Sequence, residues 1–194
     1  METTEQDRTR VRWTYSEFAR LPESGSTRYE IIDDELVVTP APGLRHQRIA
    51  TDLVTILNAF TREHGLGQLF AATADVLFAE SDYLEPDILF VRRNRAEVLT
   101  DRGVEGPPDL VVEITSPSTA ARDRGVKLER YRLYGVPEYW VVDPDDRTVE
   151  VWALGEDADE PLVLGPEDTL RWAPAEAPNG PVLEIDVGEL LGEA

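Results

Sequence analysis

The sequence contains no cysteine and one methionine, and Lys127 is its single lysine among 19 basic residues. Without cysteine, disulfides, thiolate nucleophiles and cysteine-ligated metal sites are excluded. No stretch approaches the run of about 20 apolar residues that a membrane-spanning helix needs. Residues 1–12 are polar and charged, unlike the apolar segment of a signal peptide. We therefore expect a cytoplasmic protein with no membrane partner.

Length and composition predict one globular domain. The chain has 194 residues and 21.7 kDa, enough for a single substantial core, with 41% hydrophobic and 30% charged residues. We expect one domain over residues 1–194, with a flexible segment at 1–12. Residues 155–194 are predicted to be an acidic C-terminal extension of that domain.

The net charge of −20 argues at first against a nucleic-acid partner, because phosphates repel carboxylates. The charge is unevenly distributed, however. Residues 155–194 hold eleven acids against one arginine, whereas residues 44–134 hold fourteen acids and twelve bases. Arginines gather at 92–95 and 122–132, which fits either a phosphate-binding surface or ordinary solvated faces. Half of the acidity therefore lies in a region that need not face a substrate.

Periodicity and turn residues predict a mixed α/β domain. Apolar residues recur at helical spacing over 44–65, where Gly65 closes the pattern, and a second helix is expected from Thr119 to Tyr134. A short helix is expected at 13–21. Strands are predicted at 29–40 around the turn pair Asp33-Asp34, and at 68–80, 86–93, 109–117 and 138–154, and the segment 182–191 is predicted to form a last strand and a helical turn. This order indicates an α+β fold with a central mixed sheet flanked by helices.

Two acids stand at apolar strands. Glu113 has valine and isoleucine as neighbours in a strand that is apolar on both faces, so an unpaired carboxylate there would cost several kcal/mol. Asp87 opens another apolar strand. Two carboxylates on adjacent strands are the oxygen ligands that Mg²⁺ prefers. The alternative for Glu113 is a side chain that faces solvent or pairs with an arginine. The alternative for Asp87 is an aspartate that caps the start of its strand.

Lys127 is predicted to reach Glu113. The strand runs roughly 10 Å beyond Glu113, and the following helix returns roughly 9 Å before it reaches Lys127. An ammonium is a compact donor whose pKa can shift, whereas a guanidinium remains protonated. This difference gives one reason to keep lysine here in a chain otherwise rich in arginine. Chance retention at a surface position is the alternative.

Three sequence blocks resemble the Uma2 group of endonucleases. They are Pro86-Asp87, the segment 111–119 (VVEITSPST) and the segment 123–144 (DRGVKLERYRLYGVPEYWVVDP), and residues 29–57 are similar to the N-terminal part of that group. The group belongs to the PD-(D/E)XK, restriction-endonuclease-like superfamily. The resemblance covers roughly residues 28–154. It implies a restriction-endonuclease-like core with a divalent-metal phosphodiesterase site.

The resemblance also implies roles for individual residues. Asp87, Glu113 and the backbone carbonyl of Ile114 would hold Mg²⁺ or Mn²⁺. Lys127 would replace the superfamily's lysine, which normally stands where this chain has Thr115. Glu30 would be an additional acid that contacts the metal or a water molecule. His46 also matches the family pattern, and its role is left open between the site and the structure of the fold.

These features predict a metal-dependent endonuclease that acts on nucleic acid, with DNA as the favoured substrate. The resemblance also suggests a homodimer, and the apolar strand 149–152 is a surface that a partner would cover. A zinc site is not expected, since His46 and His64 lie at opposite ends of one predicted helix. The alternative is a catalytically silent module of the same fold that binds DNA or protein. A metal-dependent hydrolase of another substrate is a third option.

Overall fold

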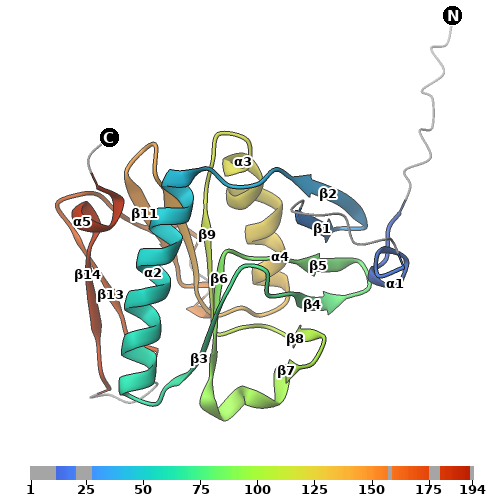
Figure 1. Ribbon diagram of the computed structural model, residues 1–194, viewed down its shortest axis with the longest axis horizontal. Coiled ribbons are helices and arrows are strands. Elements are labelled where there is room, and N and C mark those ends of the chain that lie inside the picture. Colours follow the sequence, from blue (N-terminus) through green and yellow to red (C-terminus); the bar gives the residue numbers. More distant parts are fainter. Residues whose placement is uncertain (1–11, 21–27, 157–158, 175–179, 193–194) are drawn as a thin grey trace, which may run out of the picture.

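The computed structural model describes residues 12–20, 28–156, 159–174 and 180–192. Of the segment 1–12 that was predicted to be flexible, all but Arg12 lies outside the described residues. The predicted α+β architecture, with a mixed sheet flanked by helices, is what the structure contains (Figure 1).

A six-stranded mixed sheet forms the centre of the molecule. Its strands, in order, are β12 (Leu162–Leu164), β11 (Thr148–Trp152), β10 (Tyr139–Asp143), β9 (Leu110–Ile114), β6 (Ile88–Arg92) and β3 (Gly67–Ala71). β9 runs parallel to β10 and antiparallel to β6. β9 and β10 are buried along their whole length, which explains why both strands are apolar on both faces.

A second six-stranded sheet contains the N-terminal hairpin. Its order is β2 (Glu35–Thr39), β1 (Arg28–Ile32), β5 (Asp82–Leu84), β4 (Val76–Ala79), β8 (Gly103–Glu105) and β7 (Leu99–Thr100). The predicted turn pair connects β1 to β2: Asp33 and Asp34 both have positive φ, 54° and 64°. That geometry suits a two-residue hairpin turn and is tolerated by aspartate better than by most residues.

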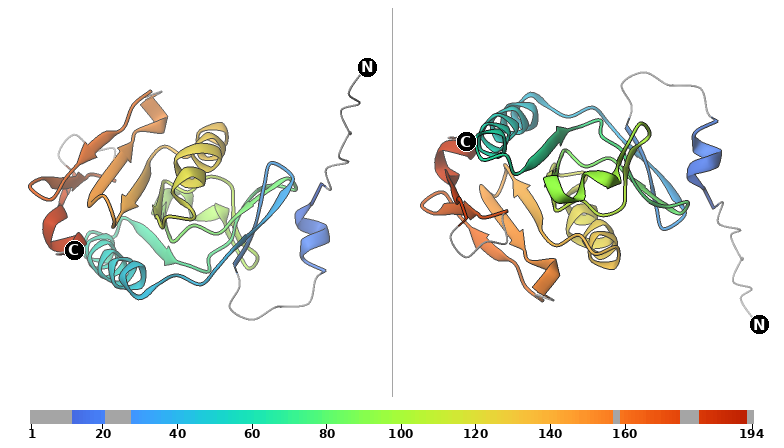
Figure 2. Two further views of the ribbon diagram at one scale, coloured as in Figure 1. Left: turned by 90° about the horizontal axis from the view of Figure 1, so that it is seen from above. Right: turned by 90° about the horizontal axis from the view of Figure 1, so that it is seen from below.

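Helices cover both faces of the central sheet (Figures 1 and 2). The helical segments are α1 (Tyr15–Phe18), α2 (Leu44–Glu63), η1 (Arg93–Val98), α3 (Ala120–Arg122), η2 (Asp123–Lys127), α4 (Leu128–Leu133), η3 (Leu154–Glu156) and α5 (Val187–Leu191). The apolar stripe of α2 packs on the face that Ile88, Val112 and Trp140 share. Val111 and Val141 point to the opposite face and pack against α4. Because strand side chains alternate, Glu113 must share the α4 face with Val111.

The helix expected from Thr119 to Tyr134 is not continuous. A π-helical segment, η2, separates α3 from α4, and Gly125 within it has the non-helical angles φ −110° and ψ −106°. Glycine tolerates such angles because it has no Cβ. The hydroxyl of Tyr139 donates a hydrogen bond of 3.0 Å to the backbone carbonyl of Asp123 in this segment. The interrupted segment ends at Lys127, whose side chain is buried.

The apolar strand 149–152 is not an exposed surface, contrary to the expectation. It forms most of β11, which is paired with β10 on one side and with β12 on the other. β12 comes from the acid-rich C-terminal region, and this pairing covers the strand within the chain itself. The C-terminal region also contributes Trp172 and Leu191 to the core that packs against α2.

Candidate active site

Asp87 and Glu113 lie next to each other because of the register between β6 and β9. Ile88 is opposite Val112 in this antiparallel pair, so the next position places Asp87 beside Glu113. The backbone N–H of Ile114 donates a hydrogen bond of 2.8 Å to Oδ2 of Asp87. Both side chains are almost completely buried. The structure therefore brings together the two carboxylates that the sequence singled out.

Lys127 reaches these carboxylates from the helical side of the sheet. Its Nζ lies 2.8 Å from Oε1 of Glu113 and 2.7 Å from Oε1 of Glu30. The lysine side chain is 2% exposed, so it is not a solvated surface residue. A buried ammonium is tolerated only when it is paired and hydrogen-bonded, which the two glutamates achieve.

Glu30 connects the N-terminal sheet to this cluster. It lies in the middle of β1 and is 1% exposed. Its Oε1 accepts a hydrogen bond of 3.1 Å from the backbone N–H of Glu85 as well as the contact from Lys127. Its Oε2 is buried and has no hydrogen-bond partner. A buried carboxylate oxygen without a partner is costly, and it marks a position where a water or a cation would be stabilised.

Asp87 is held by two cationic or potentially cationic side chains. Nη1 of Arg28 lies 2.9 Å from Oδ1, and Nε2 of His46 lies 3.1 Å from Oδ2. His46 comes from the first turns of α2 and its Nδ1 is buried without a hydrogen-bond partner. The structure thus gives His46 a contact with Asp87, which the sequence pattern left open.

These side chains surround a cavity of about 200 Å³. It is lined by Arg28, Glu30, Thr39, Pro40, Ala41, Pro42, Gly43, His46, Asp87, Glu113, Ile114, Ser116, Ser118, Thr119, Arg122, Asp123 and Lys127. The polar lining includes four carboxylates and three side chains with a fixed positive charge. The acid-rich residues 159–174 and 180–192 do not contribute to this described lining.

The two central carboxyl groups have opposite pKa shifts. Burial raises the pKa of Glu113 to about 8, and the nearby charges of Asp87, Asp123 and Glu30 add to this effect against the opposing pull of Lys127. For Asp87, burial is outweighed by His46, Arg28 and the Ile114 N–H, which together lower its pKa to about 2. Asp87 is therefore ionised near neutral pH, whereas Glu113 takes up a proton more readily than an exposed glutamate does.

Lys127 is held in its charged form. Burial alone would lower the pKa of its ammonium, but Glu113, Glu30 and Asp123 raise it above the usual range. The hydroxyl of Tyr131 donates a second hydrogen bond, of 2.8 Å, to Oε1 of Glu113. The same oxygen thus receives two donors.

The donor set fits a cation that keeps part of its water shell. Asp87, Glu113 and the Ile114 carbonyl could hold Mg²⁺ or Mn²⁺, since Mg²⁺ is usually bound by one or two carboxylates with several waters. Among the residues that the structure describes, no three His, Asp or Glu side chains are arranged to hold a metal ion on their own. A site that depends on three protein side chains therefore does not fit.

Sequence reasoning missed Arg28 and Tyr131. Arg28 lies two positions before Glu30 in β1, and this spacing places both side chains on the same face of the strand. Tyr131 lies four positions after Lys127, one helical turn along the same face. Both could have been found by asking which residues share a face with the candidates.

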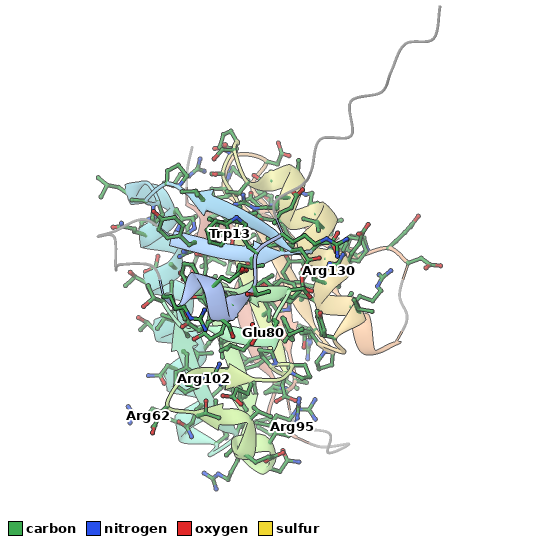
Figure 3. All side chains as sticks on the ribbon, turned by 90° about the vertical axis from the view of Figure 1, so that its right-hand side faces the viewer. Trp13, Arg62, Glu80, Arg95, Arg102 and Arg130 are labelled. Atoms are coloured by element: carbon green, nitrogen blue, oxygen red, sulfur yellow. The ribbon has the colours of Figure 1, made fainter. Side chains whose placement is uncertain are left out.

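Figure 3 shows Arg130 where α4 meets the β1–β2 hairpin, and its Nη2 lies 2.8 Å from Oδ1 of Asp33 there.

Comparison with known proteins supports this fold. The model of the Uma2 family, described as "Putative restriction endonuclease", matches residues 15–180. A crystal structure of a putative nuclease from Anabaena variabilis is similar with a TM-score of 0.74 and 22% sequence identity, over 92% of this chain and 97% of that chain. No curated protein matches the sequence. Within the described residues, no helix is long and apolar enough to cross a membrane.

Proposed function

The chain belongs to the Uma2 family of putative restriction endonucleases, and we propose that it is a divalent-metal-dependent endonuclease that hydrolyses phosphodiester bonds in DNA. The observation that carries the proposal is the position of Lys127, whose Nζ lies between Glu30 and Glu113 in the cavity that Asp87 also lines. A lysine is rarely buried between two carboxylates. Here it would stabilise the negative charge that develops on the phosphoryl group during hydrolysis.

Asp87, Glu113 and the Ile114 carbonyl are the groups proposed to hold the cation. When bound, Mg²⁺ or Mn²⁺ polarises a phosphoryl oxygen and makes a water molecule more acidic. Asp87 is ready for this role because its low pKa keeps it ionised. Glu113 would bind the cation as the carboxylate, so any proton that it carries would be released on cation binding.

Lys127 is proposed to stabilise the negative charge that develops on the phosphoryl group. The raised pKa of its ammonium favours this role over that of a general base. Glu30 would fix the ammonium through Oε1. Its buried and unpartnered Oε2 would accept a hydrogen bond from the attacking water.

The charge distribution is compatible with a nucleic-acid substrate despite the net charge of −20. Arg28, Arg122 and Lys127 line the described cavity, and the described part of the acidic C-terminal region does not. A bound divalent cation would offset further negative charge. We also propose a homodimer, since two sites related by a two-fold axis suit cleavage of both strands of a duplex.

A catalytically silent nuclease-fold module remains the second candidate. It is favoured by the ion pairs that occupy Asp87 and Glu113, because these pairs would by themselves stabilise the fold without any cation. The two candidates differ in one respect that can be measured directly, which is bond cleavage.

The test is an incubation of the purified protein with supercoiled plasmid, single-stranded DNA and RNA, with MgCl₂ or MnCl₂ and with EDTA. Asp87→Asn is the matched control, because it keeps the shape of the side chain and removes its charge. Cleavage of DNA that requires the metal and is lost in Asp87→Asn is the expected result. Wild type that cleaves none of the three substrates would favour the silent module.

A further inference from the structure

Arg28 occupies one of the two oxygens of Asp87, a residue that is proposed to hold the cation. Its side chain enters the cavity from the start of β1, and its Nη1 lies 2.9 Å from Oδ1 of Asp87. The proposed chemistry gives Arg28 no role. Its contact with a carboxylate that is proposed to hold the cation therefore needs an explanation.

The two oxygens of Asp87 differ in how firmly they are held. Oδ2 accepts a hydrogen bond from the backbone N–H of Ile114, which belongs to a buried central strand, and it also contacts His46. Oδ1 is held by the guanidinium of Arg28 at the end of a long side chain. A cation that bound Asp87 without disturbing β9 would therefore use Oδ1 and would meet Arg28 there.

Arg28 has a second acid within reach. Its Nε lies 3.8 Å from Oε2 of Glu85, a separation longer than a hydrogen bond. The other oxygen of Glu85, Oε1, accepts a hydrogen bond of 2.7 Å from the hydroxyl of Tyr83, which fixes the carboxyl group. The side chain of Arg28 is 17% exposed, compared with 2% for Lys127. The guanidinium thus lines the cavity and has a second acceptor nearby.

We propose that Arg28 is a positioning residue that substitutes for the divalent cation on Asp87 in the metal-free protein, and that the cation displaces it toward Glu85. This inference rests on the proposed function, since it requires a cation at Asp87. With Arg28 in place, Asp87 stays ionised and is not left unpaired beside Glu113. Each cation that binds must first break a charge-assisted hydrogen bond.

Two variants test this arrangement, and their combination separates it from a purely structural ion pair. Removing the guanidinium should tighten cation binding, because no bond must be broken first. A charge-assisted hydrogen bond corresponds to a change of about tenfold or more in affinity. Neutralising Glu85 should weaken cation binding while Arg28 is present, because the displaced guanidinium loses its acceptor. Glu85→Gln keeps an oxygen for the Tyr83 hydroxyl and is therefore a matched control.

The experiment is isothermal titration of the full chain with MnCl₂ alone, on wild type, Arg28→Gln, Glu85→Gln, the double variant and Asp87→Asn. Arg28→Lys is added as a variant that retains a positive charge, and circular dichroism checks the folding of each protein. We expect tighter Mn²⁺ binding in Arg28→Gln by about tenfold and an intermediate affinity in Arg28→Lys. We expect weaker binding in Glu85→Gln, and no further effect of Glu85→Gln once Arg28 is replaced.

An unchanged or weaker Mn²⁺ affinity in Arg28→Gln would overturn the proposal, as would an equal effect of Glu85→Gln with and without Arg28. If Arg28→Gln does not fold, the comparison of Arg28→Lys with wild type decides in the same direction. Asp87→Asn distinguishes a failure of the proposed role of Arg28 from a failure of the proposed cation site. Loss of binding in Asp87→Asn without tightening in Arg28→Gln refutes the role of Arg28 alone, whereas unchanged binding in Asp87→Asn refutes the cation site itself.

Discussion

The ammonium nitrogen of Lys127 lies 2.8 Å from Oε1 of Glu113, and the two side chains are 2% and 4% exposed. Glu113 lies in the central strand β9, and Lys127 lies at the end of the π-helical segment η2. Their contact therefore depends both on the sheet and on the interruption of the helix that follows it. This pair is expected to affect both the stability of the fold and the proposed activity, and variants of Lys127 separate the two effects.

Lys127→Arg should fold and bind Mn²⁺ yet lose most of its turnover. Arginine keeps the charge, but its planar guanidinium cannot occupy the point where the ammonium meets both Glu30 and Glu113. We expect the cleavage rate constant to fall by about 10²–10³, the cost of losing one positioned donor. Cleavage rates measured under single-turnover conditions test this. An arginine variant as fast as wild type would remove Lys127 from the mechanism.

Lys127→Met should destabilise the fold by about 3–5 kcal/mol, because it leaves buried carboxylates without their cation. Urea unfolding in EDTA measures the change in the free energy of unfolding. The triple variant with Glu30→Gln and Glu113→Gln is the control, since it removes the uncompensated charges as well. We expect it to recover much of the lost stability. Equal losses in both proteins would show that packing, and not charge pairing, is what Lys127 contributes.

Mn²⁺ binding should tighten as the pH rises toward about 8, the pKa of Glu113 in the folded protein. Below that pH the cation must displace a proton, and above it the carboxylate is already free. The metal-free protein has the opposite dependence. Its folded state binds more protons than the unfolded state between pH 4.5 and about 8, so its stability falls as the pH rises through that range.

Tyr131→Phe is a sensitive variant for the same titration. It removes a hydroxyl that donates to Oε1 of Glu113 and so favours the ionised form. We expect the pH at which Mn²⁺ affinity levels off to move upward. Titrations across the pH range give the midpoint for both proteins, and a midpoint that does not move, or moves downward, would contradict this assignment of the proton to Glu113.

Sedimentation equilibrium tests the proposed homodimer. The edge strand β12 exposes Leu162 and Val163, which are 62% and 55% accessible, beside the apolar strand β11. We expect a mass of twice 21.7 kDa at micromolar concentration. A mass of 21.7 kDa at that concentration would contradict the homodimer.

The sequence was sufficient to predict the elements that have strong local signals. The long amphipathic helix, the two-residue turn at Asp33-Asp34 and the apolar strand around Glu113 are all present in the structure. The proximity of Lys127 to Glu113 followed from the lengths of one strand and one returning helix. Such distances are fixed by the geometry of the elements, so they can be worked out without coordinates.

Other features depend on contacts between distant segments and were not predictable in this way. The π-helical break at Gly125 has no clear local signal, since glycine within a helical pattern is often tolerated. The pairing of β11 with β12, a strand from the acidic region, overturned the idea of an exposed apolar strand. Arg28 reaches Asp87 across 59 positions of sequence. Charge pairs of this kind are visible only in the folded chain.

The central claim is that this cavity cleaves phosphodiester bonds with the help of a cation. It is tested most directly by the single-turnover rate constant of DNA cleavage in saturating MnCl₂, measured for wild type and Glu113→Gln. Glutamine has the size of glutamate and still accepts hydrogen bonds from Lys127 and Tyr131, but it lacks the charge that would bind the cation. We predict metal-dependent cleavage by wild type and a rate constant lower by at least about 10² in Glu113→Gln. Equal rates in the two proteins, or no cleavage by wild type, would contradict it.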